Sequence, residues 1–336
     1  MPDPLKVAII GAGAVTQVAY LPVLRKVKDV EVLAICDPDV PKARALAERY
    51  GVRDAFSDIQ EVVEFEALDA LLICSPNHLH ENHVLAALAA DLHVLAERPL
   101  ALSAAGVQRV ARAAEKRGKL VFTAMNHRYR PDVQLVRGFV QAGELGEVLS
   151  VRGSWHLFRP TRQHLGWRQR KDESGGGALL DLGLPLLDLA FWLAGNPTPQ
   201  RVSASWEAPA RDRGVEQSGS VFVVCEDGPT VFIDVTWHHL GAGERFGMGL
   251  RASRGAAAIS PLTVWKELHG APTDVSPTTS GSRENAVMAS FRAQWAHFAA
   301  AVRGEAAPPA LEDQVKLAKL MDAIYRSAQD GRDVTL

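Results

Sequence analysis

The start of the chain contains a glycine pattern that could bind the phosphates of a nucleotide. Gly11 and Gly13 directly follow an apolar run, residues 5–10, and a helical pattern begins at about residue 14. The first glycine permits a tight turn, and the second lets the backbone approach a pyrophosphate. The unpaired N–H groups at the start of the helix also favour a phosphate. We therefore expect this loop to hold a dinucleotide through Gly11, Gly13, Ala14, Val15 and Thr16, the last of which replaces the third glycine of the pattern.

Asp37 could fix the adenosine ribose of such a dinucleotide. It follows a second apolar run, residues 30–36, at the spacing typical of a carboxylate that accepts hydrogen bonds from the ribose hydroxyls. A carboxylate at this place repels a 2′-phosphate, so we expect the cofactor to be NAD. Lys42 and Arg44 follow closely, and their positive charges leave NADP as the alternative cofactor.

The segments that position these residues alternate between strand and helix patterns. Strand patterns occur at residues 5–10, 30–36, 70–74, 93–96 and 120–124, with helical patterns between them. Such alternation produces βαβ crossovers and a parallel sheet. We therefore expect an α/β fold whose N-terminal domain, residues 1–125, is a Rossmann domain with a doubly wound parallel sheet.

The pattern changes in residues 126–336, which we expect to form a second domain. Strand patterns dominate at first, at residues 148–158, 202–206, 220–225, 230–236 and 247–252. Helical patterns return at 284–303 and 311–328. Successive strands joined by short turns predict a mostly antiparallel sheet, and one face of such a sheet commonly packs against a helix or a second subunit.

The composition argues against several classes of partner. The 336 residues include 37 basic and 39 acidic side chains, a formal net charge of -2 that favours neither nucleic acid nor an anionic membrane. Cys36, Cys74 and Cys225 lie far apart, which predicts a reducing compartment and no metal site. The most apolar stretch, residues 178–195, contains two aspartates, and the N-terminus lacks the layout of a signal peptide. We expect a cytoplasmic protein in which this stretch is a buried helix.

Several short motifs occur in order along the chain: Ser75-Pro76-Asn77 followed by His80, Glu97-Arg98-Pro99, Asn126 followed by Arg128, Trp167-Arg168, the glycines 175–177, and Asp181 followed by Asp188. With the glycine loop, they resemble the glucose-fructose oxidoreductase/inositol dehydrogenase (Gfo/Idh/MocA) family over nearly the whole chain. The resemblance implies a second α/β domain with an open, mostly antiparallel sheet, which binds substrate and assembles the protein into homodimers or homotetramers. It also implies cofactor contacts by Ser75, Pro76, Asn77, His80, Glu97, Arg98, Asn126, Trp167 and Arg168.

The resemblance further implies an NAD(P)-dependent oxidoreductase acting on a carbinol of a sugar, an inositol or a related polyol or sugar acid. Two positions depart from the family. Arg98 stands where the family has a lysine, and Pro185 stands where it has a histidine four residues after Asp181. Hydride transfer at a carbinol needs a partner for the hydroxyl proton. Neither arginine nor proline can exchange that proton.

Three residues are candidates for the missing chemistry. Arg98 could stabilise a developing alkoxide, or it could only support the cofactor loop through Glu97. Asp181 could take the proton if burial disfavours its charge, or it could be a carboxylate satisfied by backbone donors at a helix start. His164, in a polar loop before Trp167, is the preferred substitute for the family histidine. Weaker candidates lie in nearby motifs: His127, Tyr129 and His156.

These residues support three hypotheses about function. The preferred one is an active NAD-dependent dehydrogenase or reductase with rearranged acid–base groups. The alternative is a catalytically weakened relative that binds cofactor and ligand in order to sense or regulate. A third is redox-assisted bond cleavage, in which tightly held NAD oxidises a sugar transiently before an elimination.

Overall fold

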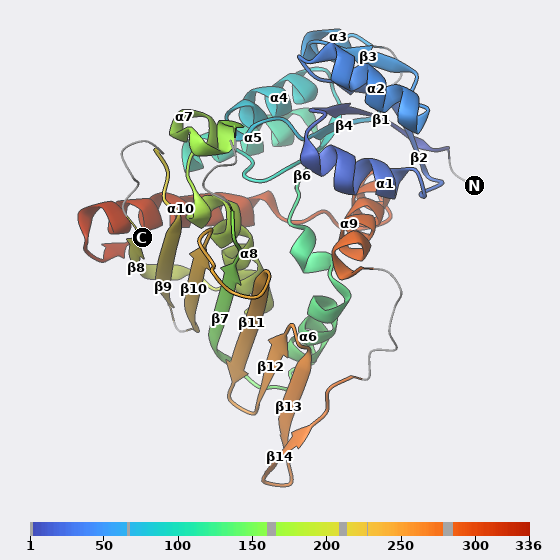
Figure 1. The fold of residues 1–336 in the computed structure, drawn as a ribbon. Helices are drawn as coiled ribbons and strands as arrows, with labels where there is room; N and C mark the ends of the chain where they lie inside the picture. The colour runs from blue at the N-terminus through green and yellow to red at the C-terminus, as the bar shows by residue number, and fades with distance from the viewer. Residues whose placement is uncertain (1–2, 66–67, 160–165, 208–213, 227, 278–284) are drawn as a thin grey trace. The chain divides into compact units, whose positions relative to one another are not determined.

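The computed structural model describes residues 3–65, 68–159, 166–207, 214–226, 228–277 and 285–336 (Figure 1). The chain divides into two compact units. The first consists of Met1–Asn126 and Val287–Val315, and the second of His127–Ala286 and Lys316–Leu336. Each unit is built around one sheet.

The first unit contains a doubly wound parallel sheet. Its six strands, counted over the described residues, lie in the order β3-β2-β1-β4-β5-β6 and are all parallel. Their bounds are β1 (Leu5–Ile10), β2 (Val30–Cys36), β3 (Asp54–Phe56), β4 (Ala70–Ile73), β5 (His93–Ala96) and β6 (Val121–Thr123). The expected Rossmann sheet is confirmed.

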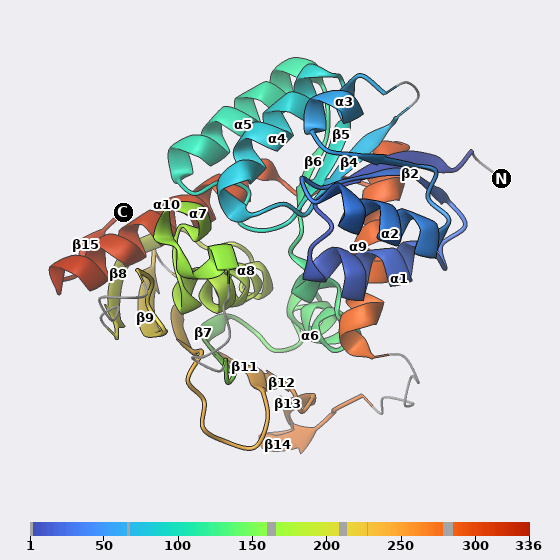
Figure 2. The same ribbon diagram turned by 45° about the horizontal axis from the view of Figure 1, so that its top comes forward.

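Helices cover both faces of this sheet. Figure 2 shows α4 and α5 together on one side and α1 on the other. The helices are α1 (Leu21–Leu24), α2 (Val40–Tyr50), α3 (Ile59–Val63), α4 (Asn77–Ala89) and α5 (Ala104–Arg117). Coverage of both faces explains why the strands are apolar runs rather than alternating patterns.

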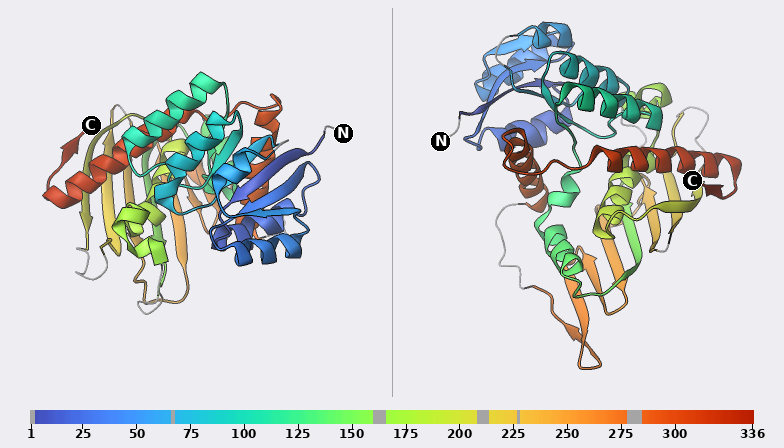
Figure 3. Two further views of the ribbon diagram at one scale, coloured as in Figure 1. Left: turned by 90° about the horizontal axis from the view of Figure 1, so that it is seen from above. Right: turned by 180° about the vertical axis from the view of Figure 1, so that it is seen from behind.

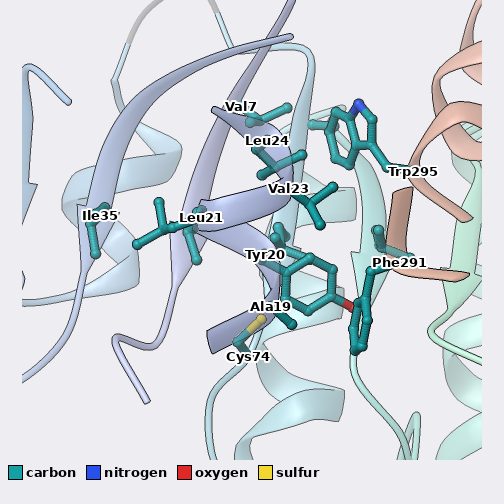
Figure 4. Packing of buried hydrophobic residues seen from close by; sticks show 14 of the residues in the cluster. Val7, Ala19, Tyr20, Leu21, Val23, Leu24, Ile35, Cys74, Phe291 and Trp295 are labelled. Carbon is teal, nitrogen blue, oxygen red and sulfur yellow. The ribbon is translucent and has the colours of Figure 1, made fainter. Parts of the chain in front are cut away.

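A helix from late in the sequence completes the first unit. Helix α9 (Ala286–Val302) contributes Phe291 and Trp295 to the cluster that also contains Tyr20 and Val23 (Figure 4). The rings of Tyr20 and Phe291 meet edge to face, with their centroids 5.1 Å apart. Large aromatic side chains contribute much of the apolar area that such a core buries. Residues more than 260 positions apart in the chain therefore stabilise the same core.

The second unit contains a larger mixed sheet. In the part of the chain that the structure describes, its nine strands lie in the order β14-β13-β12-β11-β7-β10-β9-β8-β15, and β7 and β10 are the one parallel pair. Their bounds are β7 (Val148–His156), β8 (Pro199–Trp206), β9 (Ser218–Cys225), β10 (Thr230–Thr236), β11 (Arg245–Ala252), β12 (Gly255–Ile259), β13 (Thr263–Leu268), β14 (Ala271–Asp274) and β15 (Val334–Thr335). The mostly antiparallel sheet that the sequence predicts is confirmed.

The two faces of this sheet differ. Val221 and Ile233 are buried on the face over which helix α8 (Leu184–Leu193) lies (Figure 3). Phe222 and Phe232, on the opposite face, are 38% and 40% exposed. The other helices of the second unit are α6 (Pro131–Gln141), α7 (Lys171–Ser174) and α10 (Leu311–Asp330), whose first residues belong to the first unit.

The most apolar stretch of the chain is a buried helix, as expected. Within the described ranges, one helical segment, Lys171–Leu193, has the length and composition of a membrane span. However, 83% of its most apolar window is buried inside the protein. Its apolar character is therefore explained by its packing in the core of the second unit.

Candidate active site

The glycine loop lies at the carboxyl end of β1, beside β4. This is the point where the strand order reverses, and ligands of doubly wound sheets bind at such points. Gly11 has a φ of 103°, and a Cβ atom there would lie 2.5 Å from the carbonyl oxygen of Cys74, so only glycine fits. A Cβ atom on Gly13 would meet none of the described atoms within 4 Å. The backbone at Gly13 is therefore open to a ligand.

Thr16, at the third glycine position, closes this turn. Its hydroxyl donates a hydrogen bond to the carbonyl oxygen of Gly11 at 2.6 Å, and the residue is fully buried. Thr16 also begins a π-helical turn, Thr16–Tyr20, that leads into α1. The neighbouring Ala14 and Val15 form the first residues of the helical stretch. The substitution of the glycine is therefore compensated by a hydrogen bond within the loop.

Asp37 lies at the end of β2 and contacts the same loop. Its Oδ2 accepts from the backbone N–H of Ala12 at 2.8 Å, and its Oδ1 accepts from that of Asp39 at 3.0 Å. Lys42 Nζ lies 2.9 Å from Asp37 Oδ1, while Arg44 is exposed on α2. The carboxylate is thus fixed beside the glycine turn, with one lysine next to it.

Glu97, at the end of β5, joins three segments of the first unit. Its Oε1 accepts from the hydroxyl of Tyr20 at 2.8 Å, and Gln294 of α9 donates to that hydroxyl at 3.4 Å. Arg98 places its NH1 atom 3.5 Å from Glu97 Oε2. Burial, followed by the nearby Glu97, raises the pKa of Tyr20 well above its ordinary value, so this phenol remains a donor.

The segment after β4 is held by two histidines. Ser75 lies two residues after the end of β4, Pro76 precedes α4, and α4 begins at Asn77. His80 is buried, with its Nδ1 2.7 Å from the carbonyl oxygen of Pro99 and its Nε2 2.7 Å from that of Ser75. The hydroxyl of Ser75 also lies 2.9 Å from Nδ1 of His83.

Asn126 is the last of the expected cofactor residues in the first unit. It is buried, and its amide donates to the hydroxyl of Ser290 on α9 at 3.0 Å. The other expected cofactor residues of this unit follow the strands β1, β2, β4 and β5. In a parallel sheet those carboxyl ends share one edge, so the fold brings these residues to the same edge.

In the second unit, Asp181 lies in a second π-helical turn, Leu179–Gly183, directly before α8. Its Oδ2 accepts from Arg159 at 2.7 Å and from the indole N–H of Trp237 at 3.1 Å, and the Arg159 guanidinium stacks over the Trp237 ring at 5.1 Å. The Asp181 side chain is 29% exposed and paired with Arg159, so the burial that was expected to disfavour its charge is not found. The two donors hold the carboxylate in one orientation.

Two of the three glycines before Asp181 are required by close neighbours. A Cβ atom on Gly177 would collide with the backbone of Glu216, and one on Gly176 would collide with the hydroxyl of Tyr325. The buried Glu216 carboxylate accepts from the N–H groups of Gly177 and Leu179, at 2.9 and 3.0 Å. Glu216 therefore supplies the capping interaction at the start of this helix. A cap of this kind was the alternative role that the sequence allowed for Asp181.

Pro185 is the second residue of α8, where a proline fits. Leu184 bonds back to the carbonyl of Leu179, five residues earlier, so the turn before the proline is wide. A proline in a regular helix collides with the carbonyl four residues earlier. The π-turn changes that spacing, so Pro185 is accommodated in the first turn of α8.

Two protein-family models match this chain. Residues 5–125 match the model described as "Oxidoreductase family, NAD-binding Rossmann fold", and residues 133–254 match the GFO/IDH/MocA C-terminal domain. The chain belongs to the Gfo/Idh/MocA family. Its first unit is an NAD-binding Rossmann domain.

Individual Gfo/Idh/MocA proteins are similar to this chain over different lengths. D-glucoside 3-dehydrogenase of Escherichia coli is 36% identical over 202 residues, which are 60% of this chain and 57% of that protein. A putative UDP-kanosamine synthase oxidoreductase subunit of Amycolatopsis mediterranei is 30% identical over 250 residues, 69% of this chain and 68% of that protein. The crystal structure of GenD2 from gentamicin A biosynthesis, in complex with NAD, has a TM-score of 0.85 at 26% identity and covers 100% of this chain and 97% of its own.

Not every expected site residue of this Gfo/Idh/MocA protein joins the groups above. Trp167 and Arg168 lie in a short turn, Gly166–Gln169, with the guanidinium 4.5 Å from the indole centroid. His156 bonds to Asp234 at 2.7 Å. Asp234 lies three residues before Trp237, so His156 and Asp234 occupy the sheet face opposite to Asp181. His164 lies outside the described residues.

Other polar candidates are fixed by buried contacts. Arg128 binds both oxygens of Asp188, at 2.7 and 2.6 Å, which agrees with a structural role for Asp188. Burial raises the pKa of Tyr129 to about 12, so this phenol keeps its proton at neutral pH. His127 stacks on Phe246, with ring centroids 5.0 Å apart.

Five residues that hold the candidate groups in place were not expected from the sequence: Tyr20, Arg159, Glu216, Trp237 and Gln294. None of them belongs to a short motif, and each acts across a long stretch of chain. In the described ranges, no group of three or more His, Cys, Asp or Glu residues could hold a metal ion.

Proposed function

We propose that this protein is an NAD-dependent dehydrogenase or reductase acting on a carbinol of a sugar or of a related polyol or sugar acid. The observation that carries the proposal is the glycine loop, with its open backbone at Gly13 and the fixed carboxylate of Asp37 beside it. A chain that keeps this geometry in a Gfo/Idh/MocA fold keeps the part on which oxidoreductase chemistry depends.

The first unit offers the groups that a dinucleotide needs. The backbone around Gly13 would accommodate the pyrophosphate, and Asp37 would accept from the adenosine ribose. When bound, NAD supplies the group that accepts or returns a hydride. Lys42 partly neutralises Asp37, so we propose a preference for NAD over NADP rather than exclusion of NADP.

The chain must also hold the proton of the substrate hydroxyl. We propose Asp181 for this role because Arg159 and Trp237 fix its Oδ2 and leave the half-buried carboxylate oriented by two donors. Arg98 would stabilise the developing alkoxide, since a guanidinium is a fixed source of positive charge. His164 remains the second candidate for proton transfer.

The substrate class follows from the relatives. D-glucoside 3-dehydrogenase is named for oxidation at carbon 3 of a glucoside, so we propose the secondary alcohol at that position of a pyranose as the first carbinol to test. We also propose assembly into a homodimer or homotetramer through the second sheet, supported by its exposed Phe222 and Phe232. Sedimentation of the purified protein tests the assembly, and a monomer would reject it.

A cofactor titration tests the proposal first. NADH and NADPH are added separately to the purified protein, and nicotinamide fluorescence reports binding. We expect tighter binding of NADH, and we expect Asp37→Asn to reduce the preference because it removes the charge that repels a 2′-phosphate. A panel of glucosides and sugar acids with NAD then tests turnover. A protein that binds neither dinucleotide would refute the proposal.

A further inference from the structure

His80 has two hydrogen-bond partners that a neutral imidazole cannot satisfy together. Its Nδ1 lies 2.7 Å from the carbonyl oxygen of Pro99, and its Nε2 lies 2.7 Å from that of Ser75. Both partners are acceptors only, whereas a neutral imidazole has one N–H donor and one bare nitrogen. An imidazolium donates from both nitrogens. Both hydrogen bonds of His80 therefore form only when both ring nitrogens carry protons.

The two carbonyls belong to segments with different expected roles. Ser75 lies two residues after the end of β4 and precedes the Pro76–Asn77 segment, whereas Pro99 follows Glu97 and Arg98 after the end of β5. His80 is 1% exposed, so water cannot replace a lost partner. Its protonation state thus determines whether one or both segments are held.

We propose that His80 is a positioning residue which, as an imidazolium, ties the loop after β4 to the Arg98–Pro99 segment and which, when neutral, holds only one of them. In this role it acts through the two segments that it joins. The inference rests on the proposed function only for its consequence, which is that NADH binds more tightly when both segments are held.

The surroundings of His80 place its pKa below the ordinary histidine value. Burial lowers the pKa of His80 from its ordinary value, while the two carbonyls and Glu97 oppose that shift and His78 adds to it. Burial also lowers the pKa of His83 to about 4, so His83 stays neutral across the relevant range. On the neighbouring α4 and α5, Glu81 and Arg109 are paired with each other.

NADH affinity should increase as the pH falls. Below the folded pKa of His80 both contacts form, and as the pH rises through that value one proton and one contact are lost. We therefore expect NADH affinity to increase by about tenfold as the pH falls through the folded pKa of His80, which lies below the ordinary histidine value of about 6.5, a change worth about 1.4 kcal/mol.

The protonation state can be measured without any cofactor. The full-length protein is labelled with ¹⁵N-histidine, and the ring nitrogens of His80 are identified by their proximity to Pro99 and followed against pH. We expect both nitrogens to carry protons at the acidic end and one to lose its proton as the pH rises. A ring that stays in a single neutral tautomer throughout the folded range would overturn the proposal.

The effect of His80 on NADH affinity is measured with variants. His80→Gln keeps one donor nitrogen but cannot be protonated, so its NADH affinity should be weak and independent of pH. His93→Gln is the matched control, because His93 lies at the opposite end of β5 and accepts from the N–H of Leu120. It should behave like the unmodified protein. Retained pH dependence in His80→Gln would overturn the proposal, whereas absence of NADH binding with a doubly protonated His80 would refute only the proposed function.

Discussion

The described residues include two π-helical turns, Thr16–Tyr20 and Leu179–Gly183, which have the same construction but lie in different candidate sites. Each turn is followed, two residues later, by a proline in the second position of the next helix, Pro22 in the first unit and Pro185 in the second. In both, the backbone bond reaches five residues back, from Leu21 to Thr16 and from Leu184 to Leu179. A wide turn of this kind accommodates the proline, and π-turns are frequent at functional sites.

The surroundings of the two turns differ. The first turn belongs to a loop whose geometry is set locally, since Gly11 and Thr16 bond to each other and Asp37 contacts the intervening residue. The turn with Asp181 is held from far along the chain, by Arg159 and Trp237. The cofactor loop is therefore a local structure, whereas the candidate acid–base group depends on the assembled sheet. Changes to the first should act on binding, and changes to the second on turnover.

The largest expected effect comes from Gly11→Ala. The new Cβ atom would lie 2.5 Å from a backbone oxygen at a φ of 103°, so we expect a loss of roughly 3 kcal/mol of stability and of measurable NADH binding. Gly13→Ala is the matched variant, because its Cβ atom meets no described atom within 4 Å. It should lower NADH affinity while leaving the melting temperature unchanged. Equal melting temperatures for the two variants would contradict the local account of this loop.

Asp181→Asn should act on turnover and not on binding. The amide cannot take a proton, so we expect kcat to fall by roughly 10²–10⁴-fold with the dissociation constant of NADH unchanged. Asp234→Asn is the control, since Asp234 also accepts from a side chain of the same sheet but lies on the opposite face. Full turnover by Asp181→Asn would reassign the proton to another residue, with His164→Gln as the next variant to measure.

Pro185→His would restore the histidine that the family resemblance implies. The side chain would stand four residues after Asp181 on the same helix, where it adds a group that titrates near neutrality. We expect a rise in kcat of about tenfold, at the low end of the usual effect of a positioned acid or base. Pro185→Ala separates this effect from the removal of the proline. A similar rise in both variants would show that the proline, and not the missing imidazole, limits turnover.

The difference between the two regions also explains what the sequence could predict. The Rossmann sheet and its glycine loop were predictable because apolar runs, glycines and Asp37 follow one another within about forty residues. The strands β12 to β14 were not expected, since Gly255-Ala-Ala-Ala-Ile259 has no alternating pattern and forms a strand through pairing with β11. Likewise, no motif connects Glu216 to the glycines before Asp181, because their relation exists only once the chain has folded.

The smallest expected effect is that of Glu216→Gln. This variant tests whether the turn with Asp181 is held by residues far along the chain. Burial raises the pKa of Glu216 above its ordinary value of 4.5, so its contribution to stability is complete below the unfolded pKa and is lost as the pH rises through the folded pKa. The urea unfolding free energy of the protein should therefore decrease with pH over this window, and Glu216→Gln should flatten the decrease. Glu147→Gln, at an exposed position, should retain it. Because Glu216 caps the helix that begins before Asp181, Glu216→Gln should also lower kcat more than NADH affinity, and an unchanged kcat would separate the cap from the orientation of Asp181.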